Sequence, residues 1–397
     1  MTTTKWSHFT ECIFKIMDKK ETRAFYEEHM YGRWRFGETV TYERLGSDPK
    51  KKTATEGPWA MFEVFGGEIV KIKVENGSKE SEFVVHVYLP EKEDAARYHE
   101  GSPFIVCMHP IMPKDYALKH GWACIFMDTR EIASDDTKHI GAFYDLYPYG
   151  KTTEEQTGVL MAWAWGASKV LDAVISGLGK ELGLDPLASL VTGVSRWGKA
   201  TAVCGAFDER FRMPVPACSG AGGLALFGIV SEGKTYDFSL IGGPADYTYT
   251  KNEPLDCLQS EAERGWFNDR FLEYRSPSDI PIDQENLPIL AMSPDRYYFI
   301  IAACMNEDWV NAPAMWECFL RADKVYRETG LSDNLALHFH KEGHAVIEED
   351  MELIIGYFDH MYYGFDTGVD MECLKTTVFA KQGLQKDLKD DVITKSK

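Results

Sequence analysis

The sequence predicts an α/β protein in which helices cover both faces of a mostly parallel central sheet, with an antiparallel hairpin near the N-terminus. Short, nearly continuous apolar runs at 103–109, 122–128 and 187–192 are typical of parallel strands that are buried on both faces. Between 160 and 178 the apolar residues recur three and four positions apart, which predicts an amphipathic helix before the third run. This order of strand, helix and strand favours right-handed βαβ units.

The hairpin and the remaining elements follow from local patterns. Segments 68–74 and 82–88 alternate between apolar and polar residues and flank the turn signal Asn76-Gly77, which predicts an antiparallel hairpin. Residues 20–60, before the hairpin, are polar and mixed. The elements expected after the third apolar run are a helix beginning at 200, strands at 213–217, 297–303 and 335–340, and helices at 314–327 and 347–362.

The composition is that of a globular protein with a large core. The chain has 397 residues, of which 44% are hydrophobic and 13% aromatic. Because no repeat or flexible linker divides it, we expect one domain over 20–380, preceded by an N-terminal extension at 1–20. A charged tail at 381–397 is expected to be a solvated helix or disordered.

The charge of the chain limits its partners. A net charge of −19, with no visible basic patch, makes nucleic-acid phosphate and anionic membranes unfavourable partners. No apolar run in the sequence is expected to reach the length of a membrane span. A small or neutral substrate, including an oligosaccharide, fits this charge better. The sequence leaves the oligomeric state open.

The cysteines and the first residues predict a cytoplasmic location. Nine cysteines are scattered without CxxC pairs, and an odd number favours reduced thiols over a disulfide framework. Residues 1–8 contain no apolar segment of the kind found in an export signal. A secreted location would apply if such a signal had been removed from the chain.

The most informative motif lies at 193–199, which reads Gly-Val-Ser-Arg-Trp-Gly-Lys. It connects an expected strand to an expected helix through a sharp glycine turn that carries a serine. Such a nucleophile elbow exposes a serine hydroxyl above a parallel sheet, so the motif predicts acyl transfer. The usual second glycine comes two residues after the serine, whereas Gly198 comes three residues after Ser195.

A serine nucleophile needs a base, which is usually a histidine held by a carboxylate. In an α/β-hydrolase the chain order is serine, acid, histidine, and the last two lie on loops after later strands. His344 follows the expected strand 335–340 and is the predicted base. Glu307 and Asp308 follow the expected strand 297–303, and both qualify as the acid. His338 and His340 lie within a strand and are expected to be packed or surface-facing.

Two cations accompany the serine. Arg196 and Lys199 supply positive charge beside the predicted nucleophile, which suits stabilisation of an oxyanion or recognition of a substrate carboxylate. Cations at a helix N-terminus oppose the helix dipole and need compensation. We therefore expect both side chains to serve function.

These residues resemble the glucuronoyl esterases, carbohydrate esterase family 15, whose elbow typically reads Gly-Cys-Ser-Arg-x-Gly-Lys. The resemblance extends over roughly residues 20–360. It includes Tyr-Gly-Arg-Trp at 31–34, Ala-Trp-Ala-Trp-Gly-Ala-Ser-Lys-Val-Leu-Asp at 162–172, Ala-Phe-Asp-Glu-Arg at 206–210, Ser-Gly-Ala-Gly-Gly at 219–223, Gly-Trp-Phe at 265–267, Pro-Ile-Asp-Gln at 281–284 and Gly-His at 343–344. It implies an α/β-hydrolase fold and a serine esterase that uses no metal or other cofactor.

The resemblance also implies a substrate and a role for each site residue. The implied substrates are esters of glucuronic acid that link lignin alcohols to glucuronoxylan, cleaved through an acyl-enzyme. Ser195 corresponds to the nucleophile, His344 to the base and Arg196 to an oxyanion-hole residue. The implied substrate-binding residues are Lys199, Glu263, Trp309 and, with a less regular spacing, Gln259.

One departure from the family pattern concerns the acid. Fungal members place it immediately before the Ser-Gly-x-Gly-Gly motif, where this chain has Cys218. Many bacterial members place it on the loop after a later strand, the location of Glu307 and Asp308. The neighbouring tryptophan favours Asp308, and a one-residue gap would favour Glu307.

Two other functions stay open from the sequence. The first is an acetyl-xylan or other short-acyl carbohydrate esterase of the same fold. The second is a non-catalytic carbohydrate-binding relative, which the cysteine at 218 makes conceivable and the retention of Ser195 and His344 disfavours.

Overall fold

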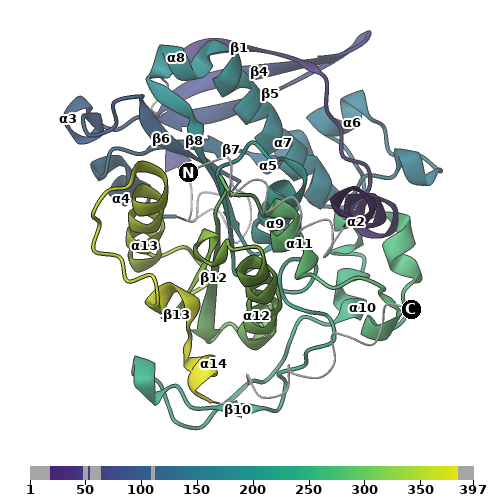
Figure 1. Ribbon diagram of the computed structural model, residues 1–397. Coiled ribbons are helices and arrows are strands. Elements are labelled where there is room, and N and C mark those ends of the chain that lie inside the picture. Colours follow the sequence, from purple (N-terminus) through teal and green to yellow (C-terminus); the bar gives the residue numbers. More distant parts are fainter. Residues whose placement is uncertain (1–17, 48–51, 54–63, 109–111, 383–397) are drawn as a thin grey trace.

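A nine-stranded sheet forms the centre of the computed structural model, which describes residues 18–47, 52–53, 64–108 and 112–382 (Figure 1). The strand order is β1-β4-β5-β7-β6-β8-β9-β12-β13. The strands are β1 Thr39–Ser47, β4 Glu68–Asn76, β5 Lys79–Tyr88, β6 Ser102–Cys107, β7 Ala123–Met127, β8 Leu184–Val194, β9 Met213–Ala217, β12 Tyr298–Met305 and β13 Leu335–Glu342. Residues 1–17 of the expected extension and 383–397 of the expected tail lie outside the described residues.

The sheet changes from antiparallel to parallel at one strand pair. β5 and β7 are antiparallel, whereas the strands from β7 to β13 pair in parallel. The predicted hairpin is confirmed: β4 pairs with β5 from Asn76 opposite Lys79, around Gly77 with a positive φ of 63°. The predicted central strands and the helix-before-elbow arrangement are also confirmed.

One edge strand was missed. β1 pairs with β4 and lies in the segment that the sequence marked only as polar and mixed. Most of its residues are exposed, so it has no apolar face that could produce a clear alternation. The antiparallel part of the sheet is therefore larger than the hairpin that the sequence predicts.

Helices cover both faces of the sheet, as predicted. One face packs against α7 Val159–Ala173, α9 Arg196–Phe207, α11 Asn286–Ala291 and α12 Ala312–Glu328, and the other against α4 Lys114–Lys119 and α13 Glu348–Phe358 (Figure 1). β6 shows the two layers directly, because Phe104 and Val106 join the first core cluster and Ile105 and Cys107 join the second. All six residues of β6 are buried, which explains its continuous apolar run.

Short elements complete the fold. The other helices are α2 Lys19–Tyr26, α3 Lys92–Ala95, α5 Thr129–Ile132, α6 Ala142–Leu146, α8 Gly179–Leu182, α10 Leu255–Leu258 and α14 Val378–Lys381. The short strands are β2 Lys52–Thr53, β3 Val64–Phe65, β10 Thr235–Tyr236 and β11 Tyr247–Thr248. Several lie in the long connection between β9 and β12, which also supplies side chains to the candidate site.

The expectation about membrane-span length is wrong for one segment. The helical run Val159–Leu182 has 24 residues, and its most apolar 18-residue stretch has a mean hydropathy of 1.3, enough by length and composition for a span. The run is this long because α7, the turn η4 Val174–Leu178 and α8 follow one another without a loop, although the backbone kinks at Gly177, which has a non-helical φ of 148°. In this protein 83% of its most apolar stretch is buried inside the molecule, which is the environment of a core helix.

Candidate active site

The predicted catalytic residues follow the carboxyl ends of neighbouring parallel strands. Ser195 directly follows β8, whereas Glu307 and His344 each lie two residues after the end of a strand, β12 and β13 respectively. Parallel strands end at one edge of the sheet, which is where α/β proteins bind ligands. The order β8-β9-β12-β13 therefore places all three residues along one edge.

The backbone turns sharply at Ser195. This residue has φ 64° and ψ −126°, a conformation that a non-glycine residue adopts at a cost of about 1–3 kcal/mol. Its N–H donates to the Ala217 carbonyl at 3.0 Å, and its own carbonyl accepts from the Lys199 N–H at 3.0 Å. The chain thus leaves the strand and enters the first turn of α9 within one residue, which is the predicted elbow geometry.

The two glycines of the elbow are required by close backbone contacts. A Cβ at Gly193 would lie 2.7 Å from the Trp197 carbonyl oxygen, and a Cβ at Gly198 would lie 2.3 Å from the Ala217 carbonyl oxygen. At the position usually occupied by glycine, Trp197 donates its indole N–H to Thr129 Oγ1 at 2.7 Å and stacks on Trp163 at 5.9 Å. The close approach to the Ala217 carbonyl falls at residue 198, so glycine is needed there and not at the usual position 197.

Gly198→Ala is expected to lower the free energy of unfolding by about 2–3 kcal/mol, because the new methyl group would collide with a backbone carbonyl. Urea unfolding followed by circular dichroism measures the change. Gly228→Ala is the matched control, since a Cβ there meets nothing within 4 Å. Equal stability of the two variants would contradict the packing argument.

The structure brings His344 together with Glu307. His344 Nδ1 lies 2.9 Å from Glu307 Oε2, and the two side chains are 23% and 19% exposed. This contact leaves Nε2 of the imidazole as the nitrogen that can face a nucleophile.

Asp308 is directed elsewhere. Its Oδ1 accepts from the Tyr247 hydroxyl at 2.6 Å, and its Oδ2 accepts from both the N–H and the hydroxyl of Thr250 at 2.8 Å. The left-handed backbone of Asn306, with φ 60°, precedes the two acids. Of the two candidates that the sequence left open, Glu307 is the one in contact with the histidine.

Cys218 directly follows β9, which lies between the strands that end near Ser195 and Glu307. Its thiol is fully buried, and burial together with the nearby Glu307 carboxylate raises its pKa well above the usual range. A thiol in this state stays protonated and neutral. The cysteine thus lies close to the acid without supplying a charge.

Arg196 is held by an acid that the sequence did not single out. Arg196 Nη1 lies 2.6 Å from Asp135 Oδ2, and Trp266 Nε1 donates to Asp135 Oδ1 at 2.8 Å. The guanidinium also lies 4.9 Å from the centre of the Trp266 ring. Asp135 therefore connects Arg196 of the elbow to Trp266 of the Gly-Trp-Phe motif, with one carboxylate oxygen on each.

Lys199 forms a buried ion pair. Its ammonium donates to Glu253 Oε2 at 2.7 Å and to the Ser219 carbonyl at 2.8 Å, and both charged side chains are 3% exposed. Glu253 also accepts from the Ala221 N–H at 2.9 Å. A buried pair needs such additional hydrogen bonds to offset the loss of hydration. Glu253 is a second residue that the sequence did not single out.

Glu263 belongs to the same charged cluster. Burial and the neighbouring Glu253 carboxylate raise its pKa, although Lys199 and Arg196 act in the opposite direction. Its Oε2 is buried and has no hydrogen-bond partner among the residues that the structure describes. An unpaired buried carboxylate oxygen is a favourable place for a ligand hydroxyl.

The two other predicted substrate-binding residues differ in their surroundings. Trp309 is half-buried, with the Lys251 ammonium 4.9 Å from its ring centre, and its carbonyl accepts from the Glu253 N–H at 2.9 Å. Gln259 donates its amide N–H groups to the carbonyls of Phe271 and Tyr274 at 3.0 and 2.9 Å. Its amide nitrogen thus holds a loop, and a role in substrate binding stays a prediction.

One group of three side chains among the described residues carries the atoms that a metal would need. His338, His340 and Asp350 offer ligand atoms within 4.8 Å of one another. In the structure both rings contact the Asp350 carboxylate at hydrogen-bond distance instead, at 2.7 and 3.1 Å.

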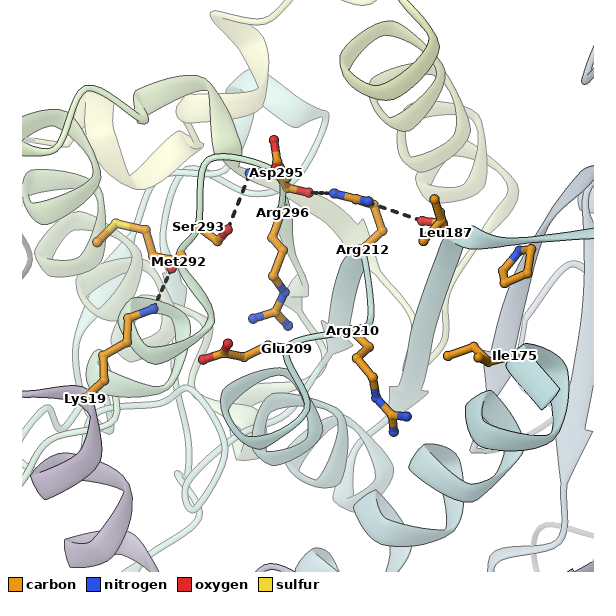
Figure 2. Close-up of a pocket in the computed structure, with 11 residues that line it drawn as sticks. Lys19, Ile175, Leu187, Glu209, Arg210, Arg212, Met292, Ser293, Asp295 and Arg296 are labelled. Atoms are coloured by element: carbon orange, nitrogen blue, oxygen red, sulfur yellow. Dashed lines mark hydrogen bonds between the residues drawn. The ribbon is translucent and has the colours of Figure 1, made fainter. Parts of the chain in front are cut away.

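A cavity of about 460 Å³ lies at the opposite, amino edge of the sheet (Figure 2). It is lined by residues that precede or begin the parallel strands, including Leu187, Arg212 and Arg296. Arg212 donates to the carbonyls of Leu187 and Asp295, as the dashed lines in Figure 2 show. None of the predicted site residues lines this cavity, and Arg296, like Arg212, donates to backbone carbonyls.

Comparison with known sequences identifies relatives over most of the chain. The family model described as glucuronyl esterase of fungi matches residues 72–330. A multidomain esterase from Ruminococcus flavefaciens is 45% identical over 368 residues, which cover 91% of this chain and 45% of that protein. A 4-O-methyl-glucuronoyl methylesterase from Podospora anserina is 27% identical over 297 residues, covering 73% of this chain and 54% of that protein. The chain thus spans about half the length of these curated relatives.

Solved structures match over a similar extent. A glucuronoyl esterase of carbohydrate esterase family 15 from Caldicellulosiruptor kristjansonii has 31% identity and a TM-score of 0.76, covering 90% of this chain and 87% of that chain. A glucuronoyl esterase from Sporotrichum thermophile in complex with methyl 4-O-methyl-beta-D-glucopyranuronate has 19% identity and a TM-score of 0.65, with 87% and 82% coverage, and supports the fold alone. Because the family model matches more than half of the chain, and a solved member is similar over nearly its whole length, this chain belongs to the glucuronoyl esterase family.

Proposed function

We propose that this protein is a serine carboxylesterase that hydrolyses esters of glucuronic acid through an acyl-enzyme. The observation that carries the proposal is the 2.9 Å contact between His344 and Glu307 on the same sheet edge as the strained turn at Ser195. A histidine oriented by a carboxylate and a serine on an elbow are the parts that acyl transfer needs. Family membership supports the same reaction.

In this mechanism Ser195 Oγ attacks the ester carbonyl while His344 Nε2 takes its proton. Glu307 stabilises the imidazolium that forms, because its carboxylate already lies beside Nδ1. Arg196 stabilises the negative oxygen of the tetrahedral intermediate through its backbone N–H and guanidinium group. The alcohol leaves with the proton from His344, and a water molecule activated by the same histidine then releases glucuronic acid from Ser195.

The uronic-acid part of the substrate is assigned to the charged cluster beside the elbow. Lys199, Glu263 and Trp309 are proposed to contact the sugar, with Glu253 holding the lysine in place. The carboxylate oxygen of Glu263 that lacks a partner among the described residues supports this assignment. The names of the relatives, which specify 4-O-methyl-glucuronoyl esters, support the same substrate class.

A substrate panel tests the proposal. Purified wild type and Ser195→Ala are compared on benzyl glucuronate, methyl glucuronate and 4-nitrophenyl acetate. We expect serine-dependent cleavage with higher kcat/KM for the glucuronate esters. Activity on the acetate alone would support a short-acyl esterase, and sugar binding without turnover of any ester would support a non-catalytic relative.

Glu263→Gln is expected to raise KM for a glucuronate ester about tenfold, because a hydrogen bond to a charged acceptor contributes about 1.5–3 kcal/mol. Cleavage of 4-nitrophenyl acetate should change little. Burial and Glu253 raise the pKa of Glu263, so its neutral form persists to higher pH than for an ordinary glutamate. The difference in KM between wild type and variant should therefore shrink as the pH falls through this raised pKa.

Glu261→Gln provides the matched control, because the Glu261 side chain is 82% exposed and pairs with Arg264 three residues away. Glu261→Gln should leave KM unchanged for both the glucuronate ester and the acetate. An equal rise in KM for the acetate and the glucuronate ester would contradict a sugar-binding role for Glu263.

The single-domain organisation and the cytoplasmic location stay predictions.

A further inference from the structure

A fully buried carboxylate lies behind the loop that carries His344. Asp350, in the first turn of α13, accepts from the Ile347 N–H at 2.8 Å and contacts Nδ1 of both His338 and His340, at 2.7 and 3.1 Å. Burial would raise the pKa of Asp350, but the hydrogen bonds from the two histidines hold it below the usual value. The group is therefore an anion with three donors around it.

His340 contacts an acceptor with each of its ring nitrogens. Nδ1 faces Asp350, and Nε2 lies 2.9 Å from the Gly343 carbonyl oxygen. A carboxylate and a carbonyl can only accept, whereas a neutral imidazole has a single N–H. Both contacts are hydrogen bonds only if His340 is an imidazolium, and its side chain is completely buried.

The charges around His340 agree with this protonation state. Burial lowers its pKa, but the hydrogen bond and charge of Asp350, with smaller contributions from the Gly343 carbonyl and Glu349, raise it overall. The other titratable groups nearby are His338, whose ring centre lies 6.4 Å away, and the neutral thiol of Cys218, which lies close to Asp350.

The contact with Gly343 links this network to the predicted base. Gly343 has φ 114°, a conformation that favours glycine, whose backbone is less restricted by its own side chain than that of any other residue. Its carbonyl belongs to the peptide bond that leads directly into His344. A hydrogen bond to that carbonyl fixes the peptide plane, and with it the direction in which the His344 side chain leaves the backbone.

We propose that His340, held as an imidazolium by Asp350, is a positioning residue that fixes the Gly343–His344 peptide and so directs the His344 imidazole. This inference rests on the proposed esterase function. Deprotonation of His340 removes one of its two hydrogen bonds. The raised pKa of His340 means that the contribution is fully present at low pH and is lost as the pH rises through that value.

The test compares His340→Gln with His338→Gln in the full chain. Both variants remove one donor from Asp350, but only His340 also contacts the His344 loop. On the best ester substrate we expect His340→Gln to lower kcat about 10- to 100-fold with KM within about twofold, because a displaced base loses catalysis and not binding. His338→Gln should keep kcat within about threefold of wild type.

The pH profile separates positioning from a merely structural role. Asp350→Asn removes the charge that favours the imidazolium, so the alkaline limb of kcat should move to lower pH, while His338→Gln should leave it in place. Equal losses of kcat in the two histidine variants, or an alkaline limb that does not move in Asp350→Asn, would overturn the inference while leaving the serine esterase function intact.

If a variant fails to fold, or if no ester is turned over, a measurement on the wild-type protein still tests the inference. Nitrogen-15 NMR of labelled histidine should show protons on both ring nitrogens of His340 at pH 7. A neutral ring would overturn the inference. Loss of activity in a chelator with recovery on adding zinc would also overturn it, because the Nδ1 atoms would then bind metal.

Discussion

Ser195→Ala is expected to lower kcat for the best ester by about a million-fold, which is the scale of loss when a triad serine is removed. Ser195 lies at the tip of the elbow, where the backbone has a strained φ of 64°. The hydroxyl of Ser219, in the next loop, accepts from the Leu224 N–H at 3.0 Å. Initial rates at enzyme concentrations high enough to detect residual turnover measure the loss.

A double variant sharpens this prediction. Residues that act as one unit give non-additive losses, so adding His344→Gln to Ser195→Ala should lower the residual rate little further. Circular dichroism spectra of the variants should match that of the wild type. Full esterase activity in Ser195→Ala would exclude Ser195 as the nucleophile and, with it, the proposed mechanism.

Glu307→Gln is expected to lower kcat by about ten-thousand-fold, the scale seen when the acid of a triad loses its charge. The amide still fits beside His344 Nδ1, but it no longer stabilises the imidazolium that forms during attack. Asp308→Asn is the matched comparison, because Asp308 holds Tyr247 and Thr250 and not the histidine. Its effect should be on stability, by about 1 kcal/mol, as measured by urea unfolding.

A compensating change tests the geometry of the acid. The Cys218 thiol is buried close enough to Glu307 for that carboxylate to raise its pKa, so the two side chains approach the same region from neighbouring strands. Adding Cys218→Asp to Glu307→Gln should recover at least about tenfold in kcat, because a carboxylate is restored near the histidine. A larger loss in Asp308→Asn than in Glu307→Gln would instead assign the acid to Asp308.

Much of the fold was predictable because its strands are buried. β6 and β12 are buried at every residue and β8 is buried from residue 188 to its end, and such nearly continuous apolar runs occur when both faces of a strand are covered. β1 was not predictable by the same logic, since an exposed edge strand needs no apolar pattern. The expected helix 160–178 agrees with α7 and η4, but the short helix α8 that follows the kink at Gly177 was not predicted, because its four residues are too few for an apolar periodicity.

The site was predictable in its parts but not in its connections. Ser195 and His344 follow from their places after strands, but the choice between Glu307 and Asp308 depends on backbone angles that spacing does not reveal. Asp135 and Glu253 reach Arg196 and Lys199 across 61 and 54 residues of chain, so no local motif marks them. Only the folded structure shows that each cation of the elbow has an acid from a distant loop.

The left-handed turn at Ser195 has a consequence for attempts to engineer this chain. A redesign guided by folding stability alone would choose glycine at position 195, because glycine adopts a positive φ without the penalty of about 1–3 kcal/mol. That choice would raise thermal tolerance and remove the nucleophile in one step. Stability therefore favours glycine at position 195, whereas catalysis requires serine. The serine has to be kept constant in any library designed to stabilise the protein.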